Sequence, residues 1–272
     1  MSVTASIVLF HNDVQEVREA IESCLSSPLI TRLYLIDNSQ TDIFRGLATD
    51  SRTVYKHCPE NRGYGAGHNL ALREMLDVAD YHLVLNPDIS FGAGVLEALV
   101  HFMYTNEDVG LVMPKVYYKD GTLQRLCKLL PTPFNLFGRR FAAASSWAEK
   151  LNRSYELADF KYDRTVDMPN LSGCFMFMRT AILRKVGGFD PRYFMYLEDI
   201  DLVRRIGQKA RTVFFPGVAV QHGYRKQSYH NKKLMRIHIL SAIKYFNKWG
   251  WFFDRWRRQK NRATLGLLQK KK

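Results

Sequence analysis

The sequence contains few cysteines and no long apolar run, and both absences restrict the class of protein. Cysteine occurs at four of 272 positions (Cys24, Cys58, Cys127 and Cys174), without the paired spacing of a zinc site or a disulfide framework. We therefore expect a reducing, cytoplasmic setting. No apolar run approaches the ~18 residues that a membrane-spanning helix needs. The first residues have the pattern of a strand, so we expect no secretory leader.

Acidic residues are almost absent from the C-terminal part of the chain. Residues 223–272 contain 15 Lys and Arg and one acid, Asp254, whereas the preceding 222 residues contain 25 basic and 25 acidic residues. A neutral domain thus carries a basic tail. We predict a domain over residues 1–228 and a basic amphipathic helical segment over 229–272. A basic nucleic-acid-binding protein without catalysis is the alternative of a different class, but only the tail supports it, and we expect no nucleic acid as partner.

Short apolar segments alternate with helical patterns along most of the chain. This alternation predicts an α/β fold with a mostly parallel, Rossmann-like central sheet flanked by helices. The predicted strands are residues 3–10, 33–36, 54–57, 81–85, 110–112, 116–118, 175–178 and 218–220. Residues 123–165 show no clear period and are predicted to form a loop or loose helices beside the site.

Three predicted strands end in polar clusters, which are His11-Asn12-Asp13, Asp37-Asn38-Ser39 and Asn86-Pro87-Asp88. In an open α/β sheet such clusters emerge at one edge and can converge on one ligand. The alternative for the third is a turn in which Asp88 caps the next helix. A segment rich in glycine and asparagine, residues 61–69, lacks the spacing of a dinucleotide fingerprint. Its glycines let backbone approach a ligand closely, or else form a plain turn.

Three carboxylates, Glu198, Asp199 and Asp201, lie within four positions at a predicted helix start. Such acids complement a helix dipole, and Asp201 with Arg205 forms an ordinary i,i+4 pair. However, residues 194–197 are aromatic or apolar, and such surroundings raise the basicity of a carboxylate. His222 ends a strand as Asp88 does, and the two could share a metal.

Taken together, these motifs resemble those of inverting family 2 glycosyltransferases of the GT-A fold. The resemblance covers residues 3–228 and is greatest for the rhamnosyltransferase-like branch that builds O-antigen and other bacterial surface polysaccharides, as in lipopolysaccharide biosynthesis. It rests on Asp37-Asn38-Ser39, the segment from Asn61 to Asn69, Asn86-Pro87-Asp88, Gly187-Gly188-Phe189-Asp190, Glu198-Asp199-x-Asp201 with Arg205, and His222.

The resemblance implies a role for each motif. Asp37 would bind the nucleotide base, and Asp199 would be the catalytic base. Asp88 and His222 would hold Mn²⁺ or Mg²⁺, although Asn86 stands where many relatives have a further Asp. The other expected donor-binding residues are Phe10, His11, Asn38, Asn61, Gly63, Gly67, Asn69 and Asn86, and those expected on the acceptor side are Glu198, Asp201 and Arg205.

The implied reaction is inverting, metal-dependent transfer of a sugar to a hydroxyl of a growing, lipid-linked glycan. The expected donor is dTDP-L-rhamnose, and the alternative is galactofuranose or another hexose carried by UDP. A nucleotidyltransferase is the other enzyme class with such a sheet. It is disfavoured because residues 5–13 contain no Gly, Lys or Arg for a phosphate loop.

The basic tail carries an apolar stripe at helical spacing, formed by Met235, Ile239, Ala242, Phe246, Trp249, Phe253 and Trp256. A stripe with Lys and Arg around it is typical of an interfacial helix. We predict that residues 230–260 bind the anionic inner membrane, which would make the enzyme peripheral on the cytoplasmic face. The alternative is packing on the catalytic domain or on a second copy in a homo-oligomer. Gly250 would divide the stripe between two helices.

Overall fold

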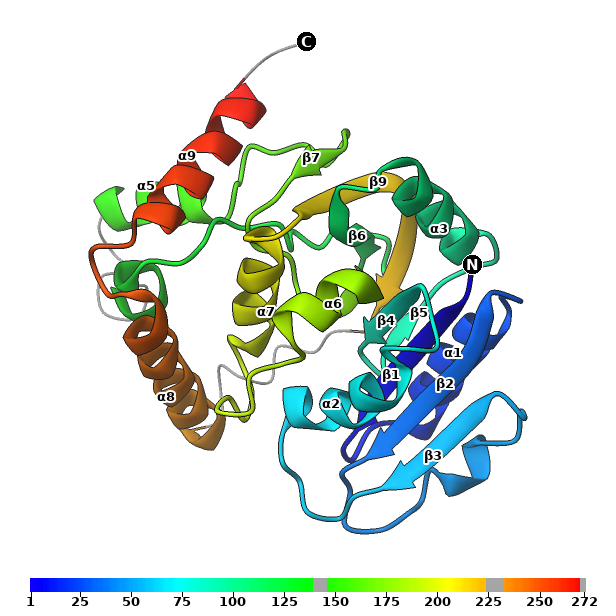
Figure 1. The fold of residues 1–272 in the computed structure, drawn as a ribbon. Coiled ribbons are helices and arrows are strands. Elements are labelled where there is room, and N and C mark those ends of the chain that lie inside the picture. Colours follow the sequence, from blue (N-terminus) through cyan, green and yellow to red (C-terminus); the bar gives the residue numbers. More distant parts are fainter. Residues whose placement is uncertain (139–145, 224–231, 270–272) are drawn as a thin grey trace.

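The structure is a computed structural model that describes residues 1–138, 146–223 and 232–269 (Figure 1). Its strands are β1 (Val3–Leu9), β2 (Ile30–Asp37), β3 (Thr53–His57), β4 (Tyr81–Leu85), β5 (Ile89–Ser90), β6 (Val109–Tyr117), β7 (Val166–Asp167), β8 (Phe175–Arg179) and β9 (Arg211–His222). Its helices are α1 (Val14–Leu25), α2 (Tyr64–Met75), α3 (Val95–Thr105), α5 (Ser146–Tyr155), α6 (Thr180–Val186), α7 (Glu198–Gly207), α8 (Lys232–Trp249) and α9 (Arg255–Gln269). A 3₁₀ turn, η1 (Arg45–Leu47), and a π-helical turn, η2 (Phe134–Gly138), complete the elements.

The strands form one sheet in the order β3-β2-β1-β4-β8-β6-β9-β5, with β7 paired to β9. The first four strands of this order are mutually parallel. β8 runs antiparallel between β4 and β6, and β6 and β9 are again parallel. The predicted α/β fold with a mostly parallel sheet is confirmed.

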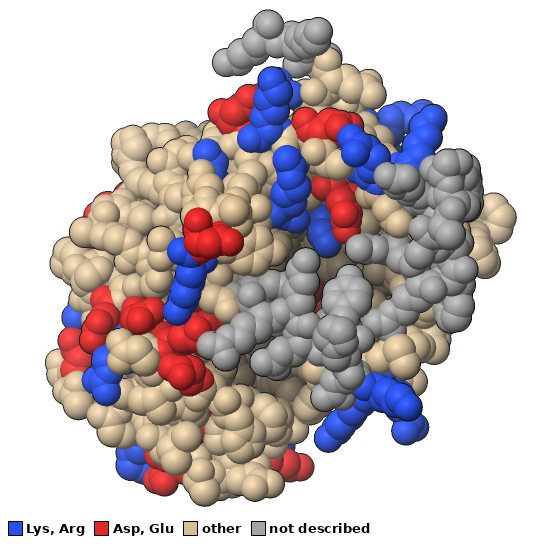
Figure 2. Space-filling view, turned by 180° about the vertical axis from the view of Figure 1, so that it is seen from behind, with Lys and Arg blue, Asp and Glu red and all other residues tan. Residues whose placement is uncertain are grey.

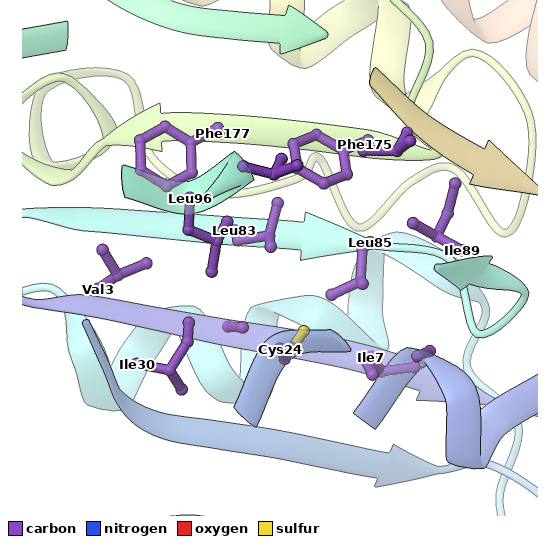
Figure 3. Close-up of a cluster of buried hydrophobic side chains, with 14 of the residues drawn as sticks. Val3, Ile7, Cys24, Ile30, Leu83, Leu85, Ile89, Leu96, Phe175 and Phe177 are labelled. Carbon is purple, nitrogen blue, oxygen red and sulfur yellow. The ribbon is translucent and has the colours of Figure 1, made fainter. Parts of the chain in front are cut away.

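Helices cover both faces of the sheet because successive side chains of a strand point to opposite faces. One core contains Ile7 of β1, Leu83 of β4 and Phe177 of β8, packed against α1 and α3. Figure 3 shows these side chains beside Cys24 of α1 and Leu96 of α3. The other core contains Val8, Val84 and Met176 with side chains of α2, α6 and α7. Strands buried on both faces explain the continuous apolar runs of the sequence.

Two strand predictions differ from the structure. Residues 110–112 and 116–118 were predicted as separate strands, but β6 is continuous across Pro114. The predicted strand 218–220 is the last part of the longer β9. The register between β6 and β9 shifts at Pro114 and Lys115. This irregularity interrupts the apolar pattern without ending either strand.

The C-terminal helices pack on the domain that precedes them. Ala242, Tyr245 and Phe246 of α8 are buried against Tyr193 and Leu197. The alternative that the stripe packs on the domain therefore holds for its central residues. No helix in the described ranges is long and apolar enough to cross a bilayer.

Gly250, whose φ is +96°, separates α8 from α9, so the stripe does divide between two helices. α9 begins directly after a buried ion pair in which Asp254 receives both Nη groups of Arg204, at 2.6 and 2.8 Å. The division of the chain at residue 228 stays a prediction, and these contacts cross it.

Candidate active site

The carboxyl ends of β1 and β2 lie side by side because the strands are parallel, with Leu9 opposite Asp37. The backbone N–H of Asn38 donates to the carbonyl oxygen of Leu9 at 2.9 Å. The N–H of His11 donates to the Ser39 hydroxyl at 3.2 Å. Two of the predicted polar clusters therefore meet at one edge of the sheet.

Asp37 is buried at this edge, and its carboxylate is held by two donors. One oxygen accepts the N–H of Ser39 at 2.9 Å, and the other accepts the Tyr55 hydroxyl at 2.7 Å. Burial raises the pKa of Tyr55, and the hydrogen bond to Asp37 adds to this shift. The hydroxyl therefore stays protonated and donates to Asp37. The Phe10 side chain at the end of β1 is 48% exposed, and its ring meets His11 edge to face at 4.5 Å.

The glycines of residues 61–69 make close contacts within the protein. Gly63 has a φ of +94°, and a Cβ there would lie 1.9 Å from the carbonyl oxygen of Phe194. The same oxygen accepts the N–H of Tyr64 at 3.0 Å. A Cβ on Gly67 would lie 2.7 Å from the Val8 side chain. The predicted close approach is thus made to the protein itself, and approach to a donor by Gly63 and Gly67 stays a prediction.

The two asparagines of this segment also have partners in the protein. Asn61 accepts the N–H of Gly63 at 2.9 Å. The Asn69 amide donates to the carbonyl oxygen of Phe189 and accepts the N–H of Phe189, both at 2.8 Å. Asn69 therefore holds the turn after Gly187-Gly188 against α2. Its predicted contact with the donor stays a prediction, because these atoms already pair with backbone.

Asp88 and His222 are adjacent, as predicted. The Asp88 carboxylate lies 3.3 Å from His222 Nε2. The Gln124 amide nitrogen donates to the carbonyl oxygen of His222 at 3.1 Å, which leaves its oxygen to accept from Nδ1 at 2.9 Å. Nδ1 therefore carries a proton, and Nε2 faces Asp88. Asn86 Nδ2 lies 3.3 Å from Nε2.

This pair fits a divalent cation. A lone pair and a carboxylate oxygen that face each other are stabilised by a cation between them, and the Gln124 contact is the outer-shell bond typical of a metal-binding histidine. Two ligands ~2.1 Å from an octahedral metal lie ~3.0 Å apart when they are at right angles, close to the separation here. The described residues contain no group of three or more His, Cys, Asp or Glu that is placed to hold a metal ion. Asp88 and His222 would therefore be the two ligands from the described part of the chain, and a substrate or water would supply others.

Glu198 and Asp199 open α7, where Glu198 is buried and Asp199 is half-buried. The Asp199 carboxylate accepts the N–H of Gly173 at 2.9 Å and that of Ile200 at 2.8 Å. Burial raises the pKa of Asp199. Burial and the neighbouring Asp199 charge raise the pKa of Glu198 to about 8. Glu198 Oε2 is buried and has no hydrogen-bond partner among the described residues.

The two predicted clusters of chemistry converge on residues Gly173 and Cys174. Asn86 donates its N–H to the carbonyl oxygen of Cys174 at 2.9 Å. Burial raises the pKa of the Cys174 thiol to about 12, and the charges of Asp88 and Asp199 add to the shift. Both carboxylates therefore lie close to this thiol. The Asp88–His222 pair and the Asp199 carboxylate therefore both lie near one short backbone segment.

Asp201 and Arg205 form the predicted i,i+4 pair, at 2.8 Å. Asp201 has no exposed surface, and it also pairs with Lys248 of α8 at 2.6 Å. Arg205 also donates to the carbonyl oxygens of Val186 and Gly188, both at 2.7 Å. These contacts give both residues a structural role, and their contact with an acceptor stays a prediction.

Three residues of the site were missed by sequence reasoning. Gln124 lies in the stretch without a period and offered no signal. Tyr64, which lies within the glycine-rich segment, donates its hydroxyl to the carbonyl oxygen of Gly173 at 2.8 Å. Tyr55 ends up beside Asp37 only through the pairing of β2 with β3.

This mixed sheet, with buried Asp37, the Asp88–His222 pair and Asp199 following its strands, has the GT-A fold of glycosyltransferases. The chain belongs to glycosyl transferase family 2, whose model matches residues 6–187. It is similar to N-acetylglucosaminyl-diphospho-decaprenol L-rhamnosyltransferase of Mycobacterium tuberculosis, with 27% identity over 69% of this chain and 65% of the relative. It is also similar to rhamnosyltransferase WbbL of Escherichia coli K12, with 25% identity over 88% of this chain and 90% of the relative. The chain thus spans about two thirds of the length of the mycobacterial relative.

Solved structures share the fold at low sequence identity. GalNAc-T7 with UDP, GalNAc and Mn²⁺ superposes with a TM-score of 0.64 at 11% identity, over 92% of this chain and 50% of the other. The mannosyltransferase PcManGT from Pyrobaculum calidifontis, in complex with GDP-Man and Mn²⁺, gives 0.56 at 16% identity, over 97% and 74%. These matches establish the fold, and the family assignment comes from the sequence.

Proposed function

We propose that the protein transfers a sugar from a nucleoside-diphosphate sugar to a glycan hydroxyl with inversion at the anomeric carbon. The observation that carries this proposal is the desolvated Asp199, which lies near the Asp88–His222 pair around Gly173 and Cys174. A base and a cation site at opposite ends of one reacting centre suit an in-line displacement.

On the donor side, Asp37 would bind the nucleotide base, and Phe10 and His11 would line its pocket. Asp88 and His222 would hold Mn²⁺ or Mg²⁺, which when bound neutralises charge on the departing diphosphate. The Mn²⁺ named with the two solved structures supports this metal. Asn86 supplies an amide in place of a second carboxylate, so we expect only modest metal affinity without the donor.

On the acceptor side, Asp199 would act as the general base. It would take the proton of an acceptor hydroxyl as that oxygen bonds to the anomeric carbon and the bond to the diphosphate breaks. The raised pKa of Asp199 strengthens the base, and the N–H of Gly173 holds the carboxylate in place. Glu198 beside it would stay protonated near neutral pH, which leaves one negative charge at this point.

The proposed donor is dTDP-L-rhamnose, because two relatives are named as rhamnosyltransferases. A UDP-hexose such as UDP-galactofuranose is the alternative, because base and sugar are not determined by the residues described above. The mycobacterial relative's name includes a lipid diphosphate acceptor. We propose a lipid-linked acceptor here as well, and a peripheral location on the cytoplasmic face of the inner membrane.

The first test is a screen of dTDP-, UDP- and GDP-sugars with Mn²⁺ or Mg²⁺ that reads out released nucleoside diphosphate. Asp199→Asn should lower transfer ~10²–10⁴-fold, because it removes the base but keeps its shape. Donor affinity, measured by calorimetry, should stay unchanged. The wild-type rate should fall as the pH is lowered, because protonation of Asp199 removes the base. The midpoint of this fall should lie above the ordinary pKa of an aspartate. Turnover of Asp199→Asn close to wild type would refute the assignment.

A further inference from the structure

Two adjacent phenylalanines are exposed at the turn between α8 and α9. Phe252 is 68% exposed and Phe253 is 88% exposed, far more than the other aromatic residues near them. The turn itself is held firmly. The Trp251 indole donates to Asn247 at 2.9 Å, and Arg257 and Arg258 donate to the carbonyl oxygens of Trp251 and Phe252, both at 3.1 Å. The rings are thus presented outward by an ordered segment.

A groove of about 580 Å³ lies beside this turn, between α9 and residues 132–134. Its walls are mostly apolar, with Pro133, Phe134, Trp251 and Leu265 among them, while Arg258 and Arg262 line it from successive turns of α9. Both arginines are exposed. We call Trp251, Phe252, Phe253, Arg258 and Arg262 the aromatic corner.

The accessible charge at the aromatic corner is of one sign. Arg255, Arg258 and Arg262 are exposed, whereas the one acid of this segment, Asp254, is buried in its pair with Arg204. Figure 2 shows the molecule from behind, and the densest group of acidic side chains lies away from the side that carries α8 and α9. Exposed aromatic rings next to cations are the chemistry that an anionic lipid surface recognises.

We propose that the aromatic corner is the surface by which the protein docks on an anionic bilayer. Phe252 and Phe253 enter the boundary between headgroups and acyl chains, and Arg258 and Arg262 contact lipid phosphates. The inference rests on the proposed lipid-linked acceptor, because docking brings the site to that substrate. It also narrows the membrane contact predicted from sequence to the part of the stripe around Phe253, because Ala242 and Phe246 of the stripe are buried in the protein.

A second copy of the chain fits this surface less well than a lipid surface does. A two-fold symmetric contact would place the same patch on both partners. The exposed arginines of one corner would then face those of the other, and like charges in contact are unfavourable. An anionic bilayer instead offers an apolar boundary for the rings and phosphate groups for the arginines.

The test uses the full chain and sedimentation with vesicles of phosphatidylcholine alone or mixed with phosphatidylglycerol. Phe252→Ser with Phe253→Ser should weaken binding to mixed vesicles at least about tenfold, because two large apolar side chains no longer leave water. Arg258→Gln with Arg262→Gln should weaken it about fivefold per charge, and only when anionic lipid is present. The matched control is Met235→Ser with Ile239→Ser, which replaces apolar residues of α8 that are 37% and 36% exposed.

Binding of the Phe252→Ser, Phe253→Ser variant equal to wild type, or an equal loss in the control, would overturn the proposal. A dimer in sedimentation velocity that becomes monomeric in this variant would assign the corner to a second copy instead. Melting temperature checks that each variant is folded. Donor hydrolysis in solution should be unchanged in all of them, so a chain that binds vesicles but releases no nucleotide contradicts the proposed function alone.

Discussion

Glu198 and Asp199 are neighbouring carboxyl groups that differ in their hydrogen-bond donors. The Asp199 oxygens accept two backbone N–H groups, which stabilise its charge. Glu198 Oε2 lacks any such donor among the described residues, so burial and the adjacent charge raise the pKa of Glu198 to about 8. Glu198 is therefore the carboxyl that is held protonated near pH 7, and such a difference in environment lets paired acids take different roles.

Glu198→Gln should keep transfer at pH 7 within about tenfold of wild type, because the amide resembles the protonated acid. It should also change the pH dependence of stability. The pKa of Glu198 is 4.5 in the unfolded chain and about 8 in the folded protein, so the native state binds more protons between these values. Its contribution to stability is complete below the unfolded pKa and is lost as pH rises towards 8.

The free energy of unfolding of Glu198→Gln should therefore rise relative to wild type from pH 5 to pH 8, by on the order of 3 kcal/mol. Urea denaturation across this range measures the difference. If the free energies of unfolding of the two proteins change with pH in the same way, Glu198 is not held protonated.

Gln124 orients His222 from outside the cation pair. Gln124→Met removes the acceptor of Nδ1–H while keeping a side chain of similar length, so Nε2 is no longer presented reliably to Asp88. Loss of such an outer-shell partner typically costs ~10–100-fold in metal affinity. We expect this loss of affinity in Mn²⁺ titrations with nucleoside diphosphate present. Binding of the nucleotide in the absence of metal should be unchanged. Unaltered Mn²⁺ affinity would move the metal site away from His222.

At the scale of elements, α2 is joined to the segment before α7 through Gly63. The carbonyl oxygen of Phe194 occupies the space that a Cβ at Gly63 would need, and it caps α2 through Tyr64. This contact brings the glycine-rich segment and the Glu198–Asp199 cluster together. The active site thus depends on a backbone-to-backbone approach that only glycine allows.

Gly63→Ala should destabilise the protein by at least about 2 kcal/mol, because it adds backbone strain to a direct overlap. Gly46→Ala is the matched control, since nothing lies within 4 Å of a Cβ there. We expect the control to change the free energy of unfolding by less than about 0.5 kcal/mol. Chemical denaturation compares the two, and a small effect at Gly63 would mean that the Phe194 segment moves aside easily.

At the scale of the whole molecule, α8 and α9 complete the core around α7. Arg204 of α7 is buried between Trp249 and Trp256, at 4.1 and 5.0 Å from their ring centres, and its charge is paired with Asp254. Lys248 and Trp249 bind Asp201 from α8. The C-terminal helices therefore support α7, the helix that carries the proposed base Asp199.

Asp254→Ala should destabilise the full chain by about 3–5 kcal/mol, because it leaves the buried Arg204 without its counter-charge. The control is Asp159→Ala, which removes an exposed partner of Arg153 and should cost at most about 1 kcal/mol. Thermal unfolding followed by circular dichroism compares them. If Asp254→Ala melts like the control, the C-terminal helices contribute little to the stability of the domain.

The sequence by itself determined the elements of the sheet and the order of its motifs. Alternation of apolar runs with helical periods is a local property, since backbone geometry sets which side chains share a face. It predicted the strands 3–10, 33–36 and 81–85. Motif order then indicated family 2, and the positions of Asp88 and His222 at strand ends suggested that the two lie together.

Tertiary structure alone decided which predicted polar residues are buried and which partners they have. Asp201 follows Asp199 by two positions, yet it is buried because Lys248 and Trp249 of α8 reach it. Gln124 contacts His222 although its segment has no recognisable period. The stripe was divided between two helices by the turn at Gly250, and contacts with the domain decided which of its residues are buried. Each of these outcomes depends on contacts between distant segments, whose free energies no local pattern encodes.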